Sequence, residues 1–131
     1  DGVLIVAIEN QFGLKYWAGA REDHTGELFG GLENRLEQDI RTFGKDRLKH
    51  LLDTEGKGCM KFYYPFPDYK IPIHIFSDST LPAVGELGDT PNYDQERCRL
   101  FNETLVWGSI IENNMFDIFA NSFLVFYREG K

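Results

Sequence analysis

A chain of 131 residues with ordinary apolar content can bury a single core, so we expect residues 1–131 to form one domain. Its formal net charge of −7 would repel phosphate backbones and anionic lipid surfaces, which argues against nucleic-acid and membrane binding and favours a basic protein as partner. The 11 Phe, 6 Tyr and 2 Trp predict a bulky core, because aromatic side chains each bury a large area.

The first predicted element is a strand at residues 3–8, a continuous apolar run rich in β-branched side chains. Runs of this kind are typical of strands buried on both faces of a sheet. A polar break at residues 9–11 separates it from residues 12–17, whose partial alternation predicts a half-buried strand. The short break favours an antiparallel hairpin at the N-terminus.

The second element is an amphipathic helix predicted for residues 27–52. Its apolar side chains recur in steps of three and four and so share one face, whereas the opposite face is charged. These apolar positions are Leu28, Phe29, Leu32, Leu36, Ile40, Phe43, Leu48, Leu51 and Leu52. Asp23 and Thr25 both suit the N-terminal cap. Gly44 predicts a kink or a split, with residues 45–53 as a second, shorter piece, because glycine in a helix interior costs about 1 kcal/mol relative to alanine.

Two strands are predicted in the middle of the chain, at residues 59–64 and 71–76, with a proline-rich turn between them. Ile71, Ile73 and Ile75 occupy alternate positions, which is typical of one strand face. Pro72 cannot donate a ladder hydrogen bond, so we expect the second of these strands at a sheet edge.

The C-terminal part is predicted to be an antiparallel meander over residues 105–127, while residues 94–107 fit either a helix or a strand. The apolar stretch at residues 123–126 suggests a homodimer formed through the C-terminal strands. The predicted fold class is therefore α+β. Its antiparallel sheet consists of the N-terminal hairpin, the two middle strands and the meander, and one long, kinked helix covers one face.

Residues 77–93 are the longest stretch without a predicted helix or strand, and long loops in compact domains are often functional. No Lys or Arg occurs between positions 71 and 96. We assign partner binding to five acids of this region: Asp78, Glu86, Asp89, Asp94 and Glu96. Such a region is either a solvated surface loop or a docking segment for a cationic protein.

No motif for a metal, a cofactor or catalysis stands out. Cys59 and Cys98 are too few for a disulfide framework, so we expect buried free thiols in a cytoplasmic protein. The spacing of Cys and His supports no zinc site. His24, His50 and His74 are candidates for a His–acid catalytic site, but nothing in the sequence brings them together.

Three functional classes follow, in this order. The first is a non-enzymatic protein-binding module, of the type of an acidic inhibitor or immunity protein that neutralises a basic partner. The second is a small-ligand-binding or sensory domain, because a sheet with one helical cover and many aromatic residues can leave an apolar pocket. The third is a small enzyme with a His–acid site. None of the sequence patterns calls for a cofactor.

Overall fold

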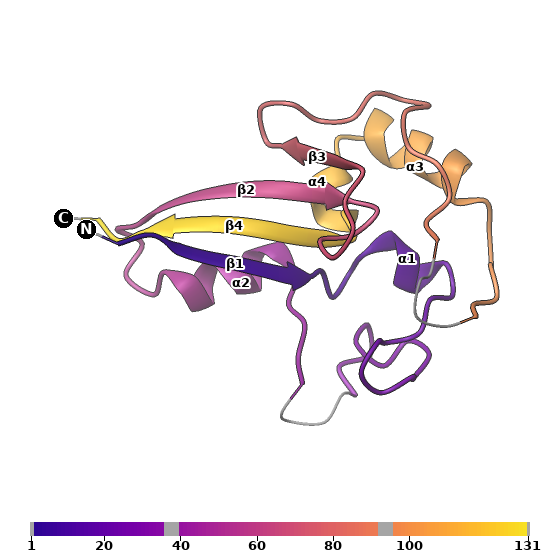
Figure 1. The fold of residues 1–131 in the computed structure, drawn as a ribbon, viewed down its shortest axis with the longest axis horizontal. Helices are drawn as coiled ribbons and strands as arrows, with labels where there is room; N and C mark the ends of the chain where they lie inside the picture. Colours follow the sequence, from indigo (N-terminus) through magenta and orange to yellow (C-terminus); the bar gives the residue numbers. More distant parts are fainter. Residues whose placement is uncertain (1, 36–39, 92–95, 131) are drawn as a thin grey trace.

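Four strands form one sheet in the computed structural model, which describes residues 2–35, 40–91 and 96–130. They are β1 (Leu4–Glu9), β2 (Cys59–Phe66), β3 (His74–Ser77) and β4 (Ser122–Arg128). Their order in the sheet is β1-β4-β2-β3, and Figure 1 shows β4 between β1 and β2. All neighbouring pairs are antiparallel, so the predicted α+β class and antiparallel sheet are confirmed.

The two middle strands lie where the sequence predicts them. β2 and β3 pair with Tyr64 opposite Phe76, and the amide of Ile73 donates to the carbonyl of Phe66 just before β3 begins. Pro72 has no N–H for the ladder, which explains why β3 starts later than predicted. As expected, β3 lies at one edge of the sheet.

The single long helix predicted for residues 27–52 is wrong. Only its last part is helical, as α2 (Lys45–Leu52), and residues 36–39 lie outside the described part of the chain. Phe29 and Asn34 have φ angles of 62° and 54°, in the left-handed region that an α-helix does not contain. The amide of Gly31 donates to the carboxylate of Glu22 at 3.0 Å, so a side chain takes the place of a helical acceptor.

The predicted N-terminal hairpin is also wrong. Residues 14–17 form a short helix, α1 (Leu14–Trp17), and not the second strand of a hairpin. The buried side chain of Asn121 explains the change of direction, because its oxygen accepts a hydrogen bond from the amide of Lys15 at 3.0 Å. The strand that pairs with β1 is β4, from the far end of the chain.

The predicted C-terminal meander contains one strand only. It begins instead with α3 (Glu103–Glu112) and α4 (Phe116–Phe119), which precede β4. The side chain of Asn102 caps α3 by accepting a hydrogen bond from the amide of Leu105 at 3.2 Å. Such a cap satisfies one of the free N–H groups of the first turn, and here it outweighs the strand preference of residues 104–107.

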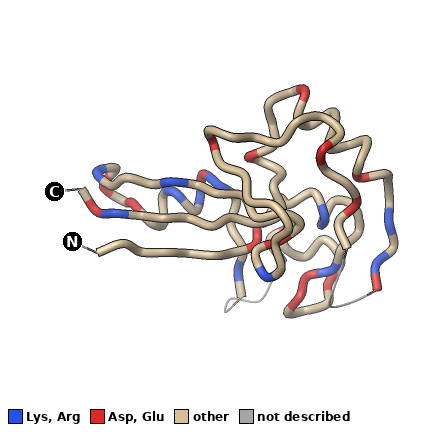
Figure 2. The backbone as a smooth tube through the Cα atoms, turned by 45° about the horizontal axis from the view of Figure 1, so that its top comes forward, with Lys and Arg blue, Asp and Glu red and all other residues tan. Residues whose placement is uncertain are grey.

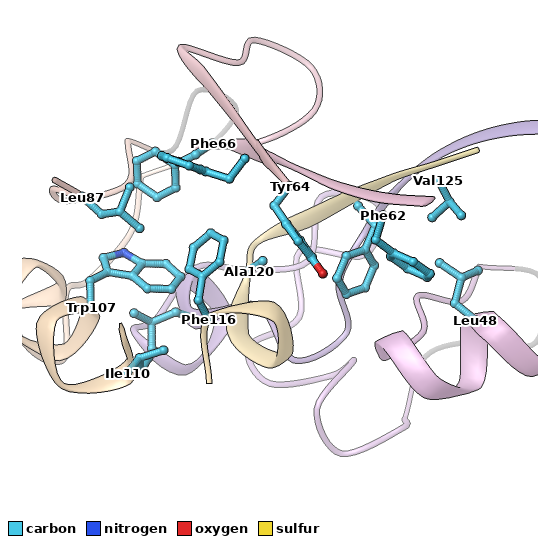
Figure 3. Packing of buried hydrophobic residues seen from close by; sticks show 13 residues of the cluster. Leu48, Phe62, Tyr64, Phe66, Leu87, Trp107, Ile110, Phe116, Ala120 and Val125 are labelled. Atoms are coloured by element: carbon cyan, nitrogen blue, oxygen red, sulfur yellow. The ribbon is translucent and has the colours of Figure 1, made fainter. Parts of the chain in front are cut away.

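The core lies on one face of the sheet, where the helices cover it (Figure 3). Phe62 and Phe123 of the sheet meet edge to face, with ring centroids 5.6 Å apart, and Tyr64 meets Phe116 of α4 at the same distance. Each such ring pair contributes about 0.5 to 1.5 kcal/mol beyond burial. The other labelled members of this cluster are Leu48, Phe66, Leu87, Trp107, Ile110, Ala120 and Val125.

The prediction that both faces of β1 are buried is wrong, and β1 lies at an edge of the sheet. Leu4 is 49% exposed and Ile5 is 57% exposed. β4 is paired on both sides, so an edge-to-edge homodimer, which stays a prediction, would have to use β1 or β3 and not the C-terminal strand. Within the described residues, no helix is both long and apolar enough to cross a lipid bilayer.

Candidate functional site

Of the five acids assigned to partner binding, Asp78 contacts a lysine of the same chain. Lys45 Nζ lies 3.1 Å from Asp78 Oδ1 and 2.9 Å from Asp117 Oδ2. It also donates to the hydroxyl of Tyr64 at 2.6 Å, and that hydroxyl donates to Asp78. Partial burial works against ionisation of Asp78, but the hydrogen bonds from Tyr64 and Lys45 outweigh it and lower the pKa of this carboxyl below its usual value.

This group, which we call the Lys45 cluster, joins four parts of the fold: α2, β2, the turn after β3, and α4. It consists of Lys45, Tyr64, Asp78 and Asp117. The ammonium group has three donors, and the three oxygens around it match that number. Its charge also lies 5.2 Å from the ring centroid of Phe62. The contacts of Lys45 therefore link these four parts of the fold to one another.

The other four predicted acids are placed differently from one another. Asp89 pairs with Arg99 at the surface. Glu86 and Glu96 are exposed and make no ion pair with any residue that the structure describes. Asp94 lies outside the described residues. Figure 2 shows acidic positions on several separate loops, with basic positions between them. The described part of the region therefore keeps two unpaired acids out of the five proposed.

A second charged group, the Glu9 cluster, lies at the end of β1 and consists of Glu9, Lys15, Tyr16 and Asp68. Glu9 is 7% exposed and Lys15 is 6% exposed. Lys15 Nζ lies 2.6 Å from Glu9 Oε1 and 3.9 Å from Asp68 Oδ2, and the Tyr16 hydroxyl donates to the other oxygen of Glu9. Burial and then the charge of Glu9 raise the pKa of the Tyr16 hydroxyl, so it stays a donor.

Two more acids, Glu22 and Asp23, lie next to the Glu9 cluster, and the pKa values of their carboxyl groups shift in opposite directions. Burial raises the pKa of Glu22, although the hydrogen bond from the Gly31 amide opposes this. Burial would also raise the pKa of Asp23, but the hydrogen bond and charge of Lys70 outweigh it, so that this pKa is lowered. Both carboxylate oxygens of Glu9 already have partners, which indicates a structural role for the cluster.

The histidines give the His–acid hypothesis no support in the described part of the chain. His24, His50 and His74 are all exposed, and none of them makes a hydrogen bond or ion pair with an acid there. His74 stacks on Phe76, with ring centroids 5.9 Å apart.

The two cysteines are free, as expected, but both are exposed, so the prediction of buried thiols is wrong. Cys59 begins β2 at a sheet end, and Cys98 lies in the loop before α3. Among the residues with described positions, no group of three or more His, Cys, Asp or Glu side chains could hold a metal ion.

The sheet face opposite the core, which we call the outer face, carries exposed apolar side chains. In antiparallel pairs, residues directly opposite each other share a face. Ile5 lies opposite Phe126, which lies opposite Lys61 on the next strand. The same alternation places on this face Ala7, Cys59, Tyr63, Leu124 and Arg128. The rings of Tyr63 and Phe126 are 5.5 Å apart and border an open hollow of about 390 Å³.

The free side of β1 presents unpaired backbone groups next to this face. The amide of Asn10 donates to the carbonyl of Asn121, in the register that pairs β1 with β4. Even-numbered residues of β1 therefore bond to β4, and the backbone groups of Ile5, Ala7 and Glu9 point to the free side. Phe43 covers the free side of the chain just after β1, where the amide of Gln11 donates to the carbonyl of Phe43 at 3.3 Å.

Sequence motifs and comparisons leave these features unassigned. The Lys45 and Glu9 clusters join residues far apart in the chain, such as Lys45 and Asp117 at a separation of 72, so no local pattern marks them. The apolar run of residues 3–8 did mark the strand β1, but it did not mark that strand as an edge strand. Comparisons of the chain with protein-family models, curated proteins and solved structures found no match.

Proposed function

We propose that this chain is a non-enzymatic protein-binding module and that the free edge of β1 accepts a β-strand of a partner polypeptide. The observation that carries the proposal is the exposure of Leu4, Ile5 and Ala7 on β1, an edge strand on which the outward backbone groups of Ile5 and Ala7 have no partner in the described structure. Strand addition supplies hydrogen bonds for these groups and covers the alternating side chains.

The contrast between the two edges of the sheet supports this assignment. Edge strands are usually short or are protected by charges, prolines or bulges, because an open edge invites pairing with other chains. β3 follows this rule, since it has four residues and Pro72 lies just before it. β1 has six residues, and Leu4, Ile5 and Ala7 are all exposed without a Lys or Pro among them. The unprotected edge is the one suited to a partner.

The geometry also fixes the length of the docking edge. Phe43 pairs with the chain just after β1, in a parallel bridge to Asn10, so an added strand would end beside Glu9. The free edge therefore offers the outward groups of Ile5 and Ala7, because Glu9 faces Phe43, and this suits a short strand of about four residues.

The test uses a library of displayed ten-residue peptides selected on the purified chain, followed by binding measurements with the synthetic peptides recovered. We expect peptides with alternating apolar residues. The substitution Ala7→Pro removes one outward N–H while keeping every bond to β4, so it should weaken binding at least about tenfold. The matched control Ala7→Val keeps the N–H and should bind as wild type does. Hydrogen exchange should slow at Ile5 and Ala7 in the complex.

Two outcomes would count against strand addition at β1. One is a set of selected peptides that bind Ala7→Pro as tightly as wild type. The other is a stable dimer in light scattering that Ala7→Pro converts to monomer, which would make a second copy of the chain the occupant.

A second candidate keeps the acidic region as the docking surface for a basic protein, in the manner of an acidic inhibitor or immunity protein. Its support is the exposure of Glu86 and Glu96 without a basic partner in the described structure, together with the net charge of −7. Binding of a cationic probe such as polylysine should then weaken steeply with salt, and Glu86→Lys should weaken it further. Salt-independent binding would exclude this reading.

A further inference from the structure

The exposed charged side chains that the strand register places on the outer face are both basic, although the chain as a whole is acidic. Lys61 and Arg128 are exposed on this face, and neither makes an ion pair with a residue that the structure describes. Acids near that end of the sheet gather on the opposite side, around Tyr127, whose neighbouring charges are Asp53, Glu55 and Glu129. The outer face therefore combines an apolar centre with an unpaired basic margin.

The apolar centre is continuous with the free edge of β1. Ile5 is exposed beside Phe126, and Phe126 contacts Tyr63 across β4 and β2. The hollow on this face is lined by Val3, Cys59, Lys61, Tyr63, Phe126, Tyr127 and Arg128. A partner strand added to β1 would thus bring the adjoining part of its own chain close to this face.

The size and shape of the surface favour one kind of occupant. A second copy joined through β1 would extend the sheet but leave both outer faces in water. A stable specific interface buries about 1,000 Å² or more, which a six-residue edge alone does not reach. An antiparallel sheet with one face in water usually has polar side chains on that face, whereas the outer face here carries the apolar residues Ile5, Ala7 and Phe126. The opposite face is already covered by helices. A helix on the outer face would supply the remaining layer.

We propose that an amphipathic α-helix of the partner polypeptide covers the outer face, with its apolar stripe on Ile5 and Phe126 and with carboxylates beside Lys61 and Arg128. The inference deepens the proposed function and rests on it for the identity of the partner. Opposite charges at the margin of an apolar contact fix the orientation of the helix and raise its rate of association.

The experiment compares two labelled helical peptides of about 18 residues with the same leucine stripe, one flanked by Glu and one by Lys. Fluorescence anisotropy at low salt should show the acidic peptide binding about tenfold more tightly. The double substitution Lys61→Glu with Arg128→Glu should reverse this order. Ile5→Lys should abolish binding of the acidic peptide, because it places a charge in the apolar centre. Lys57→Glu, at a lysine outside the outer face, is the matched control and should change neither affinity.

Each alternative result has a definite meaning. Equal binding of the two peptides, or binding that survives Ile5→Lys, would overturn the inference. Vesicles containing anionic lipid that bind the chain through Lys61 and Arg128 would assign the face to a membrane surface and would also overturn it. The two kinds of peptide separate this inference from strand addition: the helical peptide should bind whether or not the selection recovers strand peptides, so failure to recover strand peptides counts only against the proposed function.

Discussion

Replacing Lys15 by methionine should remove a large part of the stability of this protein. Methionine keeps the unbranched side chain but leaves the buried carboxylate of Glu9 without its ammonium partner, which lies 2.6 Å away in wild type. Breaking a buried ion pair from one side typically costs about 3 to 5 kcal/mol. Total stabilities of small domains are about 5 to 15 kcal/mol, so the variant should be near the limit of folding.

The loss of stability in Lys15→Met cannot exceed the free energy needed to protonate the unpaired carboxylate, and this free energy depends on pH. In Lys15→Met, the carboxylate of Glu9 can bind a proton and so lose its charge. Protonating an ordinary carboxyl group costs about 4 kcal/mol at pH 7 but only about 1 kcal/mol at pH 5. The deficit of Lys15→Met should therefore be about 3 to 4 kcal/mol at pH 7 and should shrink markedly at pH 5.

Urea unfolding followed by circular dichroism at both pH values measures these differences. The double variant Glu9→Gln with Lys15→Met removes both charges and should be more stable than Lys15→Met alone. Lys57→Met is the exposed control, because its pair with Glu55 is open to water and should be worth less than about 0.5 kcal/mol. A deficit of Lys15→Met below about 1 kcal/mol at pH 7, or one that is unchanged at pH 5, would refute the reasoning.

Three further predictions follow from other contacts. Lys45→Met should lower the free energy of unfolding in urea by about 2 kcal/mol. The loss should be smaller than in Lys15→Met, because Asp78 and Asp117 keep contact with water. An unfolding midpoint equal to that of wild type would contradict the role of Lys45 in linking these elements. Asn102→Ala should cost about 1 kcal/mol in thermal unfolding, since it removes the cap of α3, and Asn102→Asp should restore most of that loss. Because burial raises the pKa of Glu22, its contribution is present at pH values below the ordinary carboxyl pKa and is lost as the pH rises through the folded value. Glu22→Gln should therefore gain stability relative to wild type as the pH rises above the ordinary carboxyl pKa of about 4, and a stability difference that does not change with pH would argue against a raised pKa.

The elements that the sequence predicts correctly are those with a local signal. The alternation of Ile71, Ile73 and Ile75 and the proline beside them gave both a strand and its edge position. The cap of α3 was equally local, since Asn102 precedes the helix directly, so this helix could have been predicted in place of the meander. The expected split at Gly44 is confirmed, because Gly44 precedes α2 directly and α2 covers Lys45–Leu52.

The elements that the sequence misses depend on distant partners. Residues 27–35 have helical periodicity, but the carboxylate of Glu22 takes the amide of Gly31 and the backbone turns. Residues 12–17 alternate like a strand, but Asn121 holds the amide of Lys15 from the other end of the chain. A local pattern reports which side chains prefer burial, and it does not report which acceptor a backbone N–H will find.

By itself, the sequence determined that this acidic, aromatic-rich chain would form an antiparallel α+β structure with a bulky core, because composition and two-residue alternation are local properties. Only the tertiary structure decided that β1 lies at an edge, that Asp78 and Asp89 are paired with Lys45 and Arg99, and that the basic residues Lys61 and Arg128 share one face. These outcomes depend on strand order and register, and strand order is set by contacts between residues far apart in the chain.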